Sequence, residues 1–153
     1  MVCMDRIVIL LVTAAFGLLG CSDSTGPGPS TGPDPARFIG VIQPGLRVTV
    51  ILAPDTVSVS TPFEVTVNSY GSSTCTIPDG VELILTENSA LITPYDRLPA
   101  GQAVCTGDIA PRPHPVELQF TVAGIASIEV IGYRLTGEGA VLTSMERTVV
   151  VRP

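Results

Sequence analysis

The sequence is short of the residues on which many active sites depend. Its 153 residues include no lysine, no tryptophan and one histidine, His114. Without lysine the chain cannot form a Schiff base, and a single histidine gives little scope for imidazole catalysis or a histidine-based metal site. The sequence also offers no Gly-x-Ser-x-Gly motif and no assignable pair of catalytic acids. We therefore expect a protein that is not an enzyme, with no catalytic residues, no metal and no cofactor.

Positive charge is also scarce. Eight basic residues, all of them arginine, face fourteen acidic residues, which gives a formal net charge of −6. Nucleic-acid binding needs clustered cations that neutralise phosphates, so the composition argues against nucleic acid as a partner.

Helical periodicity is missing after residue 20, whereas residues that form turns are abundant. The chain has 15 glycines and 14 prolines, which interrupt helices, and 45% of its residues are apolar, which is enough for a packed core. At roughly 100 to 200 residues per domain, the length allows one domain with short appendages. The composition therefore favours a single, loop-rich, all-β domain.

The first 20 residues have the organisation of an export signal. A short head containing Arg6 precedes an apolar run at residues 7–20, and small residues lead up to Cys21. The run is 14 residues long, shorter than the roughly 20 residues that a membrane-spanning helix needs. Residues 1–20 are therefore predicted to be a signal peptide.

The residues around Cys21 carry a more specific signal. Leu18-Leu19-Gly20-Cys21 resembles the lipobox of bacterial lipoproteins. In that family the matching cysteine is joined to diacylglycerol and becomes the N-terminus when the signal peptide is removed. The resemblance implies lipid attachment at Cys21, the membrane as a partner and the bacterial cell envelope as the location; an ordinary secreted protein is the alternative. Ser22 resembles the outer-membrane sorting class, which favours the outer membrane, facing the periplasm or the surface, over the inner membrane.

Residues 21–36 are predicted to comprise the lipidated cysteine and a disordered linker. After Cys21 this stretch contains only Ser, Thr, Gly, Pro and Asp, with one Ala at its end, so it cannot form a core. Such a chain spans about 20 Å as a flexible coil and up to about 45 Å as polyproline II. It would separate the anchor from the folded domain.

Residues 37–153 contain short runs of alternating apolar and polar residues, separated by glycine and proline. This spacing is typical of a β-sandwich. Strands are predicted at residues 37–43, 46–52, 56–60, 63–70, 81–86, 116–122, 126–134 and 141–151, with a short one at 91–93 left open, which makes seven to nine strands.

The alternation also predicts which side chains face the core and where the chain turns. The inward sets are Phe63, Val65 and Val67; Val81, Leu83 and Leu85; Val116, Leu118, Phe120 and Val122; and Ile128 and Val130. Turns are predicted at Pro44-Gly45, at Asp79-Gly80 and at Gly137-Glu138-Gly139, the last at the tip of a hairpin.

Residues 53–67 and 124–132 look like the early and late strands of the bacterial immunoglobulin-like domains found on envelope proteins. The resemblance implies an immunoglobulin-like antiparallel β-sandwich. The core tryptophan of antibody domains is absent and the cysteines fall in predicted loops, so the inter-sheet disulfide of that family is not carried over. The fold alone specifies no function, because it hosts adhesion, binding and scaffolding alike.

Cys75 and Cys105 are the two cysteines that remain once Cys3 is removed with the signal peptide and Cys21 is lipidated. In an exported chain two such cysteines usually pair, whereas a redox or metal site would need C-x-x-C spacing or a nearby histidine. We predict a structural disulfide between them.

Residues 87–101 form the least regular stretch of the domain and contain the candidate contact residues Tyr95, Arg97 and Leu98. Tyrosine and arginine are enriched in protein–protein interfaces, and loops at the ends of β-sandwiches are common binding surfaces. The alternative is that this stretch simply covers one end of the sandwich.

Two other groups of polar residues are expected in loops. Asp55, Asp79, Asp96 and Asp108 are predicted to be solvated turn carboxylates, since their spacing matches no calcium loop. His114 lies among the prolines at 111, 113 and 115, which predict a stiff loop leading into a strand; a proline-rich docking motif is the alternative.

These features favour a membrane-anchored envelope lipoprotein that acts as a non-enzymatic binding or scaffolding module with a protein partner in the envelope. One form of this role is that of an accessory subunit of a larger assembly. The alternative is a lipoprotein that binds a small ligand or a carbohydrate, which would need a concave patch with exposed aromatic rings. Aromatic residues make up only 5% of the chain.

Overall fold

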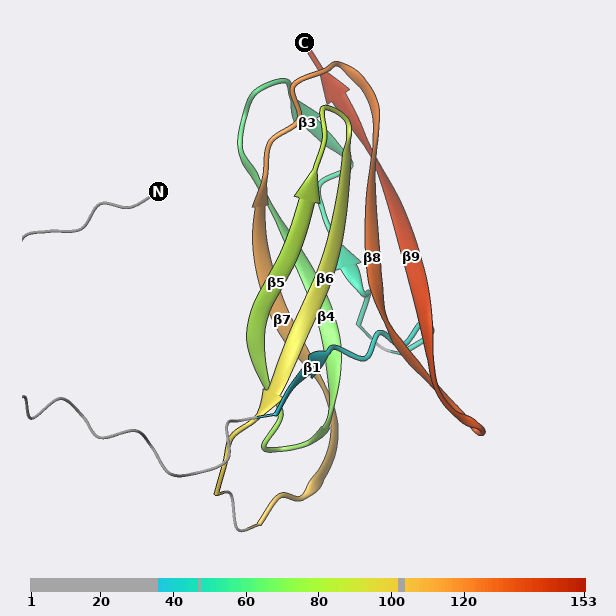
Figure 1. Ribbon diagram of the computed structural model, residues 1–153. Coiled ribbons are helices and arrows are strands. Elements are labelled where there is room, and N and C mark those ends of the chain that lie inside the picture. The colour runs from blue at the N-terminus through green and yellow to red at the C-terminus, as the bar shows by residue number, and fades with distance from the viewer. Residues whose placement is uncertain (1–35, 47, 102–103) are drawn as a thin grey trace, which may run out of the picture. The chain divides into compact units, whose positions relative to one another are not determined.

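The computed structural model describes residues 36–46, 48–101 and 104–153, which form an all-β domain of two sheets (Figure 1). The predicted signal peptide, Cys21 and all but the last residue of the predicted linker lie outside the described residues. Within the described part of the chain, no helix is long and apolar enough to cross a membrane.

Within the described residues, nine strands make up the two sheets. They are β1 (Ala36–Ile39), β2 (Ile51–Leu52), β3 (Thr56–Ser58), β4 (Phe63–Ser73), β5 (Ile77–Leu85), β6 (Ser89–Leu98), β7 (Gly107–Leu118), β8 (Gly124–Thr136) and β9 (Gly139–Arg152). Each overlaps a predicted strand, including the one left open at residues 91–93. The largest differences are that β6 covers most of the stretch expected to be irregular and that β7 begins at Gly107 instead of residue 116.

The larger sheet has six strands in the order β1-β6-β8-β9-β3, with β5 paired to β6. Since β5 occupies one side of β6, strands β1 and β8 pair with successive parts of its other side. The smaller sheet has the order β2-β4-β7 and is antiparallel throughout. The sandwich was expected to be antiparallel, but β6 pairs with β8, and β3 with β9, in parallel.

The core lies between the two sheets. Its fully buried apolar side chains come from both, with Val65, Val67 and Leu118 from the smaller sheet and Ile92, Ile128 and Val130 from the larger. The predicted inward faces of β4 and β8 are therefore confirmed, and so is that of β7, except that Val122 lies beyond the end of the strand and is 43% exposed. The prediction for β5 is confirmed for Val81, which packs against the core, and is wrong for Leu83 and Leu85, which are 37% and 42% exposed. β5 is the outermost strand on its side of the sheet, so the opposite sheet does not cover its end.

Two of the three predicted turns are confirmed. Pro44-Gly45 forms a turn in which Gly45 has a φ of 86°, and β8 and β9 form a hairpin around residues 137 and 138. Asp79-Gly80 instead lies inside β5, at a bulge between Pro78 and Val81. Gly80 has a φ of 85° there, a conformation that glycine adopts without steric cost.

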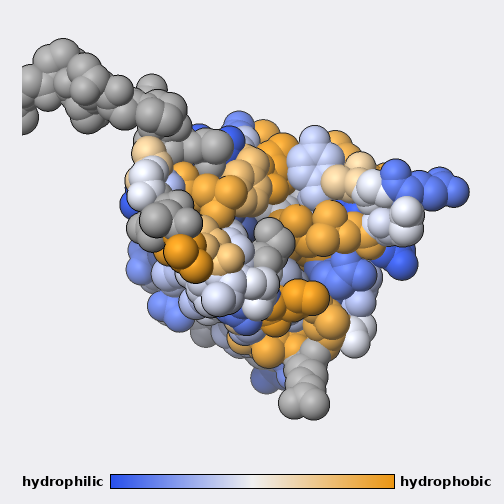
Figure 2. Space-filling model, turned by 90° about the horizontal axis from the view of Figure 1, so that it is seen from below, coloured by the Kyte–Doolittle hydropathy of each residue, from blue (hydrophilic) through white to orange (hydrophobic). Residues whose placement is uncertain are grey.

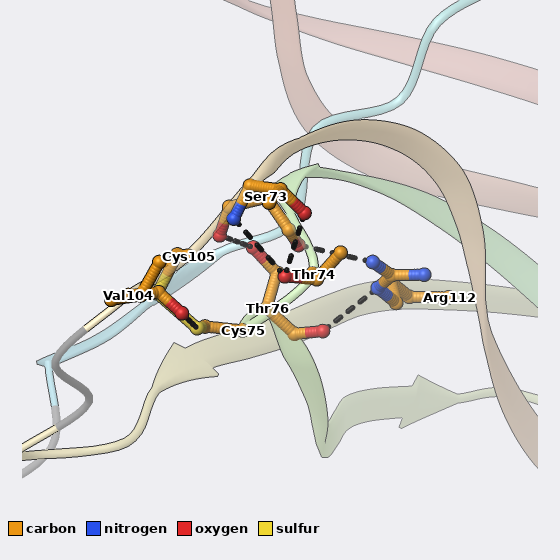
Figure 3. Close-up of a disulfide and its surroundings, with 8 residues drawn as sticks. Ser73, Thr74, Cys75, Thr76, Val104, Cys105 and Arg112 are labelled. Atoms are coloured by element: carbon orange, nitrogen blue, oxygen red, sulfur yellow. Dashed lines mark hydrogen bonds between the residues drawn. A yellow bond between two sulfur atoms is a disulfide. The ribbon is translucent and has the colours of Figure 1, made fainter.

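The predicted disulfide is present (Figure 3). Cys75 lies in the turn between β4 and β5, and Cys105 lies just before β7, with their Cα atoms 5.6 Å apart. The side chain of Arg112 donates to the carbonyls of Ser73 and Thr76 on either side of Cys75, at 3.0 and 2.7 Å. The bridge and these hydrogen bonds together fix the β4–β5 turn to β7.

Candidate binding surfaces

The predicted contact residues lie in a regular strand and not in an end loop. Tyr95, Arg97 and Leu98 belong to β6, where the even-numbered residues from Ala90 to Asp96 are buried and the odd-numbered ones face outward. The alternation is hidden in the sequence because the buried set includes a proline and an aspartate. The expectation of an irregular stretch at residues 87–101 is therefore wrong for most of its length.

Tyr95 and Arg97 belong to a polar network on the outer face of the larger sheet. The Tyr95 hydroxyl donates to Glu82 Oε2 at 3.1 Å, and the guanidinium of Arg37 lies 3.8 Å from the centroid of the tyrosine ring. Asp79 lies 3.1 Å from Arg37 and 3.2 Å from Arg97. The hydrogen bond to the Glu82 carboxylate raises the pKa of Tyr95. The network links β1, β6 and β5, although Nε of Arg97, which lies close to Asp79, forms no hydrogen bond within the described residues.

The second half of β5 carries an exposed apolar edge. Leu83, Ile84 and Leu85 are 37%, 57% and 42% exposed. Consecutive residues of a strand point to opposite faces, so both faces of this half are apolar. Among the strands that the structure describes, β5 pairs only with β6, so the other edge of residues 81–85 has no strand partner.

Three polar side chains that were not predicted to be neighbours contact one another inside the sandwich. Ser69 on β4, Asp96 on β6 and His114 on β7 are all essentially buried. Ser69 Oγ donates to Asp96 Oδ2 at 2.7 Å and lies 3.0 Å from His114 Nε2. Asp96 and His114 were expected in solvated or stiff loops, and both expectations are wrong.

The geometry of this trio differs from that of a hydrolytic triad. In a triad the acid holds the histidine nitrogen that faces away from the serine. Here Asp96 Oδ1 lies 3.3 Å from Nε2, the same nitrogen that faces Ser69, and Nδ1 lies 3.2 Å from the carbonyl of Gly80. Burial also keeps substrate away from the hydroxyl. The trio therefore connects the two sheets, and Gly40 backs it so closely that an added Cβ would lie 2.8 Å from Ser69 Cβ.

The other predicted aspartates differ from one another in their surroundings. Asp55 lies in a loop and pairs with Arg147 at 2.8 Å, as a solvated carboxylate would. Asp79 and Asp108 lie in β5 and β7 and pair with arginines, so they are not turn residues. No group of three or more His, Cys, Asp or Glu side chains within residues 36–46, 48–101 and 104–153 could share a metal ion.

A hollow of about 640 Å³ opens at the end of the sandwich where β4 ends and β7 begins. Its apolar lining comes from Val41, Leu46, Tyr70, Ile109 and Leu135, and its polar lining includes Gln43 and Asp108. A smaller adjoining hollow shares Leu46, Tyr70 and Ile109. Figure 2 views this end of the described domain and shows hydrophobic residues gathered on it. Sequence reasoning missed the hollow because its residues are far apart along the chain.

No protein-family model, no curated protein and no solved structure matches the chain.

Proposed function

We propose that the chain is a lipoprotein of the bacterial cell envelope, anchored to the outer membrane through Cys21, whose domain is a non-enzymatic binding module. The lipobox-like residues before Cys21 and the signal-like run before them support the anchor. The Cys75–Cys105 disulfide suits the oxidising environment outside the cytoplasm. The two facing sheets are compatible with an immunoglobulin-like sandwich, which we retain as part of the proposal.

The observation that carries the binding function is the open second half of β5. Proteins normally protect edge strands with lysine, proline, bulges or covering loops. β5 has Pro78 and a bulge in its first half, but residues 81–85 contain neither proline nor lysine, and their one charged side chain, Glu82, accepts a hydrogen bond from Tyr95 on the neighbouring strand. An extended apolar segment of a partner could add to this edge, with backbone hydrogen bonds providing affinity and side-chain contacts providing specificity.

Tyr95, Arg97 and Leu98 remain proposed contacts in this arrangement. They lie on the strand next to β5, and Leu98 and the outward side chains of Tyr95 and Arg97 are accessible. Their role would be to contact the side chains of a segment that has already paired with β5.

Site-specific photocrosslinking tests the proposal. A photoreactive residue replaces Ile84 in the full chain, produced in the cell that normally makes it, and the control carries it at Ile125, which is 73% exposed on β8. We expect a crosslink at position 84 and none at 125, mapping to one contiguous apolar stretch of another envelope protein. A product of twice the chain's mass would show that a second copy occupies the edge, and no product at position 84 would contradict the proposal.

The anchor has its own test. Metabolic labelling with palmitate should mark the wild-type protein, whereas Cys21→Ala should remain unlabelled. Equal labelling of both proteins, or recovery of an unlipidated protein from the periplasm, would contradict lipid attachment at Cys21.

The alternative function, small-ligand binding, is favoured by the hollow. Its lining suits an apolar ligand better than a carbohydrate, because Tyr70, the aromatic residue in the wall, is only 6% exposed and donates its hydroxyl hydrogen to the carbonyl of Val48 at 2.7 Å. No aromatic ring in this wall is therefore free to stack on a sugar.

A further inference from the structure

The hollow lies at the end of the sandwich from which the predicted linker leaves. Ala36 begins β1 and is the first residue that the structure describes. Val41, in the wall of the hollow, follows five residues later, so at about 3.3 Å per residue the two lie within about 17 Å of each other. The hollow and the start of the domain are therefore neighbours.

The length of the linker limits how far this end can lie from the anchor. Fourteen residues, 22–35, separate Cys21 from β1. A chain of their composition has a typical span of about 20 Å. If Cys21 carries lipid, as the proposed function holds, the end with the hollow stays close to the bilayer, and even weak contacts there are favoured by a high effective concentration.

The surface at this end suits a lipid environment. Ile109 is 76% exposed and Leu135 is 52% exposed, and with Leu46 they surround the hollow. Asp108, the carboxylate in the wall, pairs with Arg112 at 3.1 Å, which offsets its charge. Contiguous apolar surface of this kind marks an interaction site, unlike the single exposed apolar residues found on any protein.

We propose that Leu46, Ile109 and Leu135, around the hollow, rest in the interfacial region of the bilayer that holds the Cys21 lipid. The inference rests on the proposed lipid anchor, which brings this end to the membrane. Apolar side chains that enter the boundary between headgroups and acyl chains add a second membrane contact to that of the lipid. The domain then has a fixed orientation instead of tumbling on its linker.

This orientation keeps the β5 edge available. Leu85 pairs with Ala90, and Ala90 pairs with Ile128. Leu135 follows Ile128 by seven residues along β8, a distance of about 23 Å. In Figure 1 the end of β5 and the end of β8 lie at opposite ends of the sandwich. With the hollow on the membrane, the exposed half of β5 points away from it.

The absence of tryptophan allows a direct experiment. Ile109→Trp and, in a separate protein, Leu135→Trp each introduce a single fluorescent reporter at the proposed contact. Ile125→Trp is the matched control, because Ile125 is 73% exposed and lies ten residues before Leu135 on β8. Each lipidated full-length protein is isolated from membranes and reconstituted into vesicles of phosphatidylethanolamine and phosphatidylglycerol with brominated acyl chains.

The expected result is a blue-shifted emission and at least about two-fold quenching by brominated lipid at positions 109 and 135, with little change at position 125. Equal quenching at all three positions, or none, would overturn the proposal. A blue shift at 109 without quenching would also overturn it, because a small ligand or a second copy would then occupy the hollow. Mass spectrometry of the same samples reports the Cys21 lipid. Missing lipid with quenching retained would refute the anchor alone, and intact lipid without quenching would refute the membrane contact alone.

Discussion

The two sheets end side by side in strands that are protected very differently, β7 in the smaller sheet and β5 in the larger. In the pairing of β7 with β4, Pro111 lies opposite Tyr70 and Pro113 lies opposite Asn68. The N–H groups of Tyr70 and Asn68 point away from β7 and donate to the carbonyls of Val41 and Val50. Alternate positions of an antiparallel pair share this direction, so the proline nitrogens face the open edge, where no N–H is left to pair with another chain. β5 has no such protection over residues 81–85. Of these two edges β5 is therefore the more open, and this difference supports the proposal that a partner binds there.

The first half of β5 resembles β7 in being closed. Pro78 and the bulge interrupt its edge, Asp79 pairs with Arg37 and Arg97, and the Gly80 carbonyl faces His114. One strand thus contains a protected half and an open half. The open half begins where contact with the buried trio ends.

Among the tests of this comparison, Asp96→Ala is expected to have the largest effect, a loss of unfolding free energy. Asp96 on β6 contacts Ser69 and His114, and His114 holds β7 next to β5, so the change removes a buried partner from two polar side chains. Each buried polar group left without a partner costs about 1 to 3 kcal/mol of unfolding free energy, which makes about 2 to 6 kcal/mol for the two. Urea unfolding measures the loss. The control is Asp55→Ala, at a carboxylate that is 94% exposed, where we expect a change within about 1 kcal/mol. A loss for Asp96→Ala no larger than that of the control would contradict the structural role of the trio.

The same trio shows where sequence reasoning succeeds and where it stops. β4, the end of β7 and β8 were predicted because each has one continuous apolar face, which a period of two reveals. β6 was missed because its inward face includes Pro94 and Asp96, and the start of β7 because alternating prolines are as typical of a stiff loop as of an edge strand. Whether each of these stretches forms a strand depends on the strand next to it, and the local sequence pattern contains no information about that neighbour.

For a related reason, neither the exposure of Leu83 and Leu85 on β5 nor the existence of the hollow could be predicted from the sequence. The alternation of Val81, Leu83 and Leu85 is correct for a strand, but it does not say whether the opposite sheet extends far enough to cover it. The disulfide needed only the compartment and the cysteine count. It was predictable because no pairing of strands had to be known.

The second prediction concerns the Cys75–Cys105 disulfide, which closes a loop that contains both halves of β5. The bridge joins residues 30 apart and encloses β5 and β6. Removing it with Cys75→Ser and Cys105→Ser should lower the unfolding free energy by about 3 to 4 kcal/mol, because the unfolded chain gains conformational entropy. The thermal midpoint of the double variant should match that of the reduced wild type. Free thiols that react with an alkylating reagent before reduction would show that the bridge does not form in the exported protein.

The third prediction concerns a charge placed on the edge of β5, a feature that protects many natural edge strands. We expect a smaller effect on stability than in the first two predictions, but a large effect on partner binding. Ile84→Lys places a charge in the middle of the open half. The unfolding free energy should change by no more than about 0.5 kcal/mol, because the side chain is 57% exposed. Crosslinking from position 83 to the partner should be lost.

Tyr95→Ala combined with Arg97→Ala is the companion test, since these residues flank the strand without forming its edge. We expect a weaker reduction in crosslinking than with Ile84→Lys. A complete loss with the double variant and none with Ile84→Lys would move the binding surface from the edge of β5 to the outer face of β6.

The smallest expected effect is the alkaline titration of the outer network beside the protected half of β5. The hydrogen bond to Glu82, with some desolvation, raises the pKa of Tyr95 above its ordinary value of 10.0. A group whose pKa is raised by folding contributes stability that is fully present below the unfolded pKa and is lost as the pH rises through the folded value. The contribution of Tyr95 should therefore be constant at neutral pH and decline above about pH 10. Absorbance titration of the folded protein should include a component from Tyr95 that ionises above the ordinary range of tyrosine, and Tyr95→Phe should remove that component. Glu82→Gln is the matched variant, because it keeps an acceptor for the hydroxyl but removes the negative charge, so the Tyr95 pKa should fall toward its ordinary value. An unchanged titration in Glu82→Gln would show that the carboxylate does not control Tyr95, and that the network joining β1, β6 and β5 is weaker than its distances suggest.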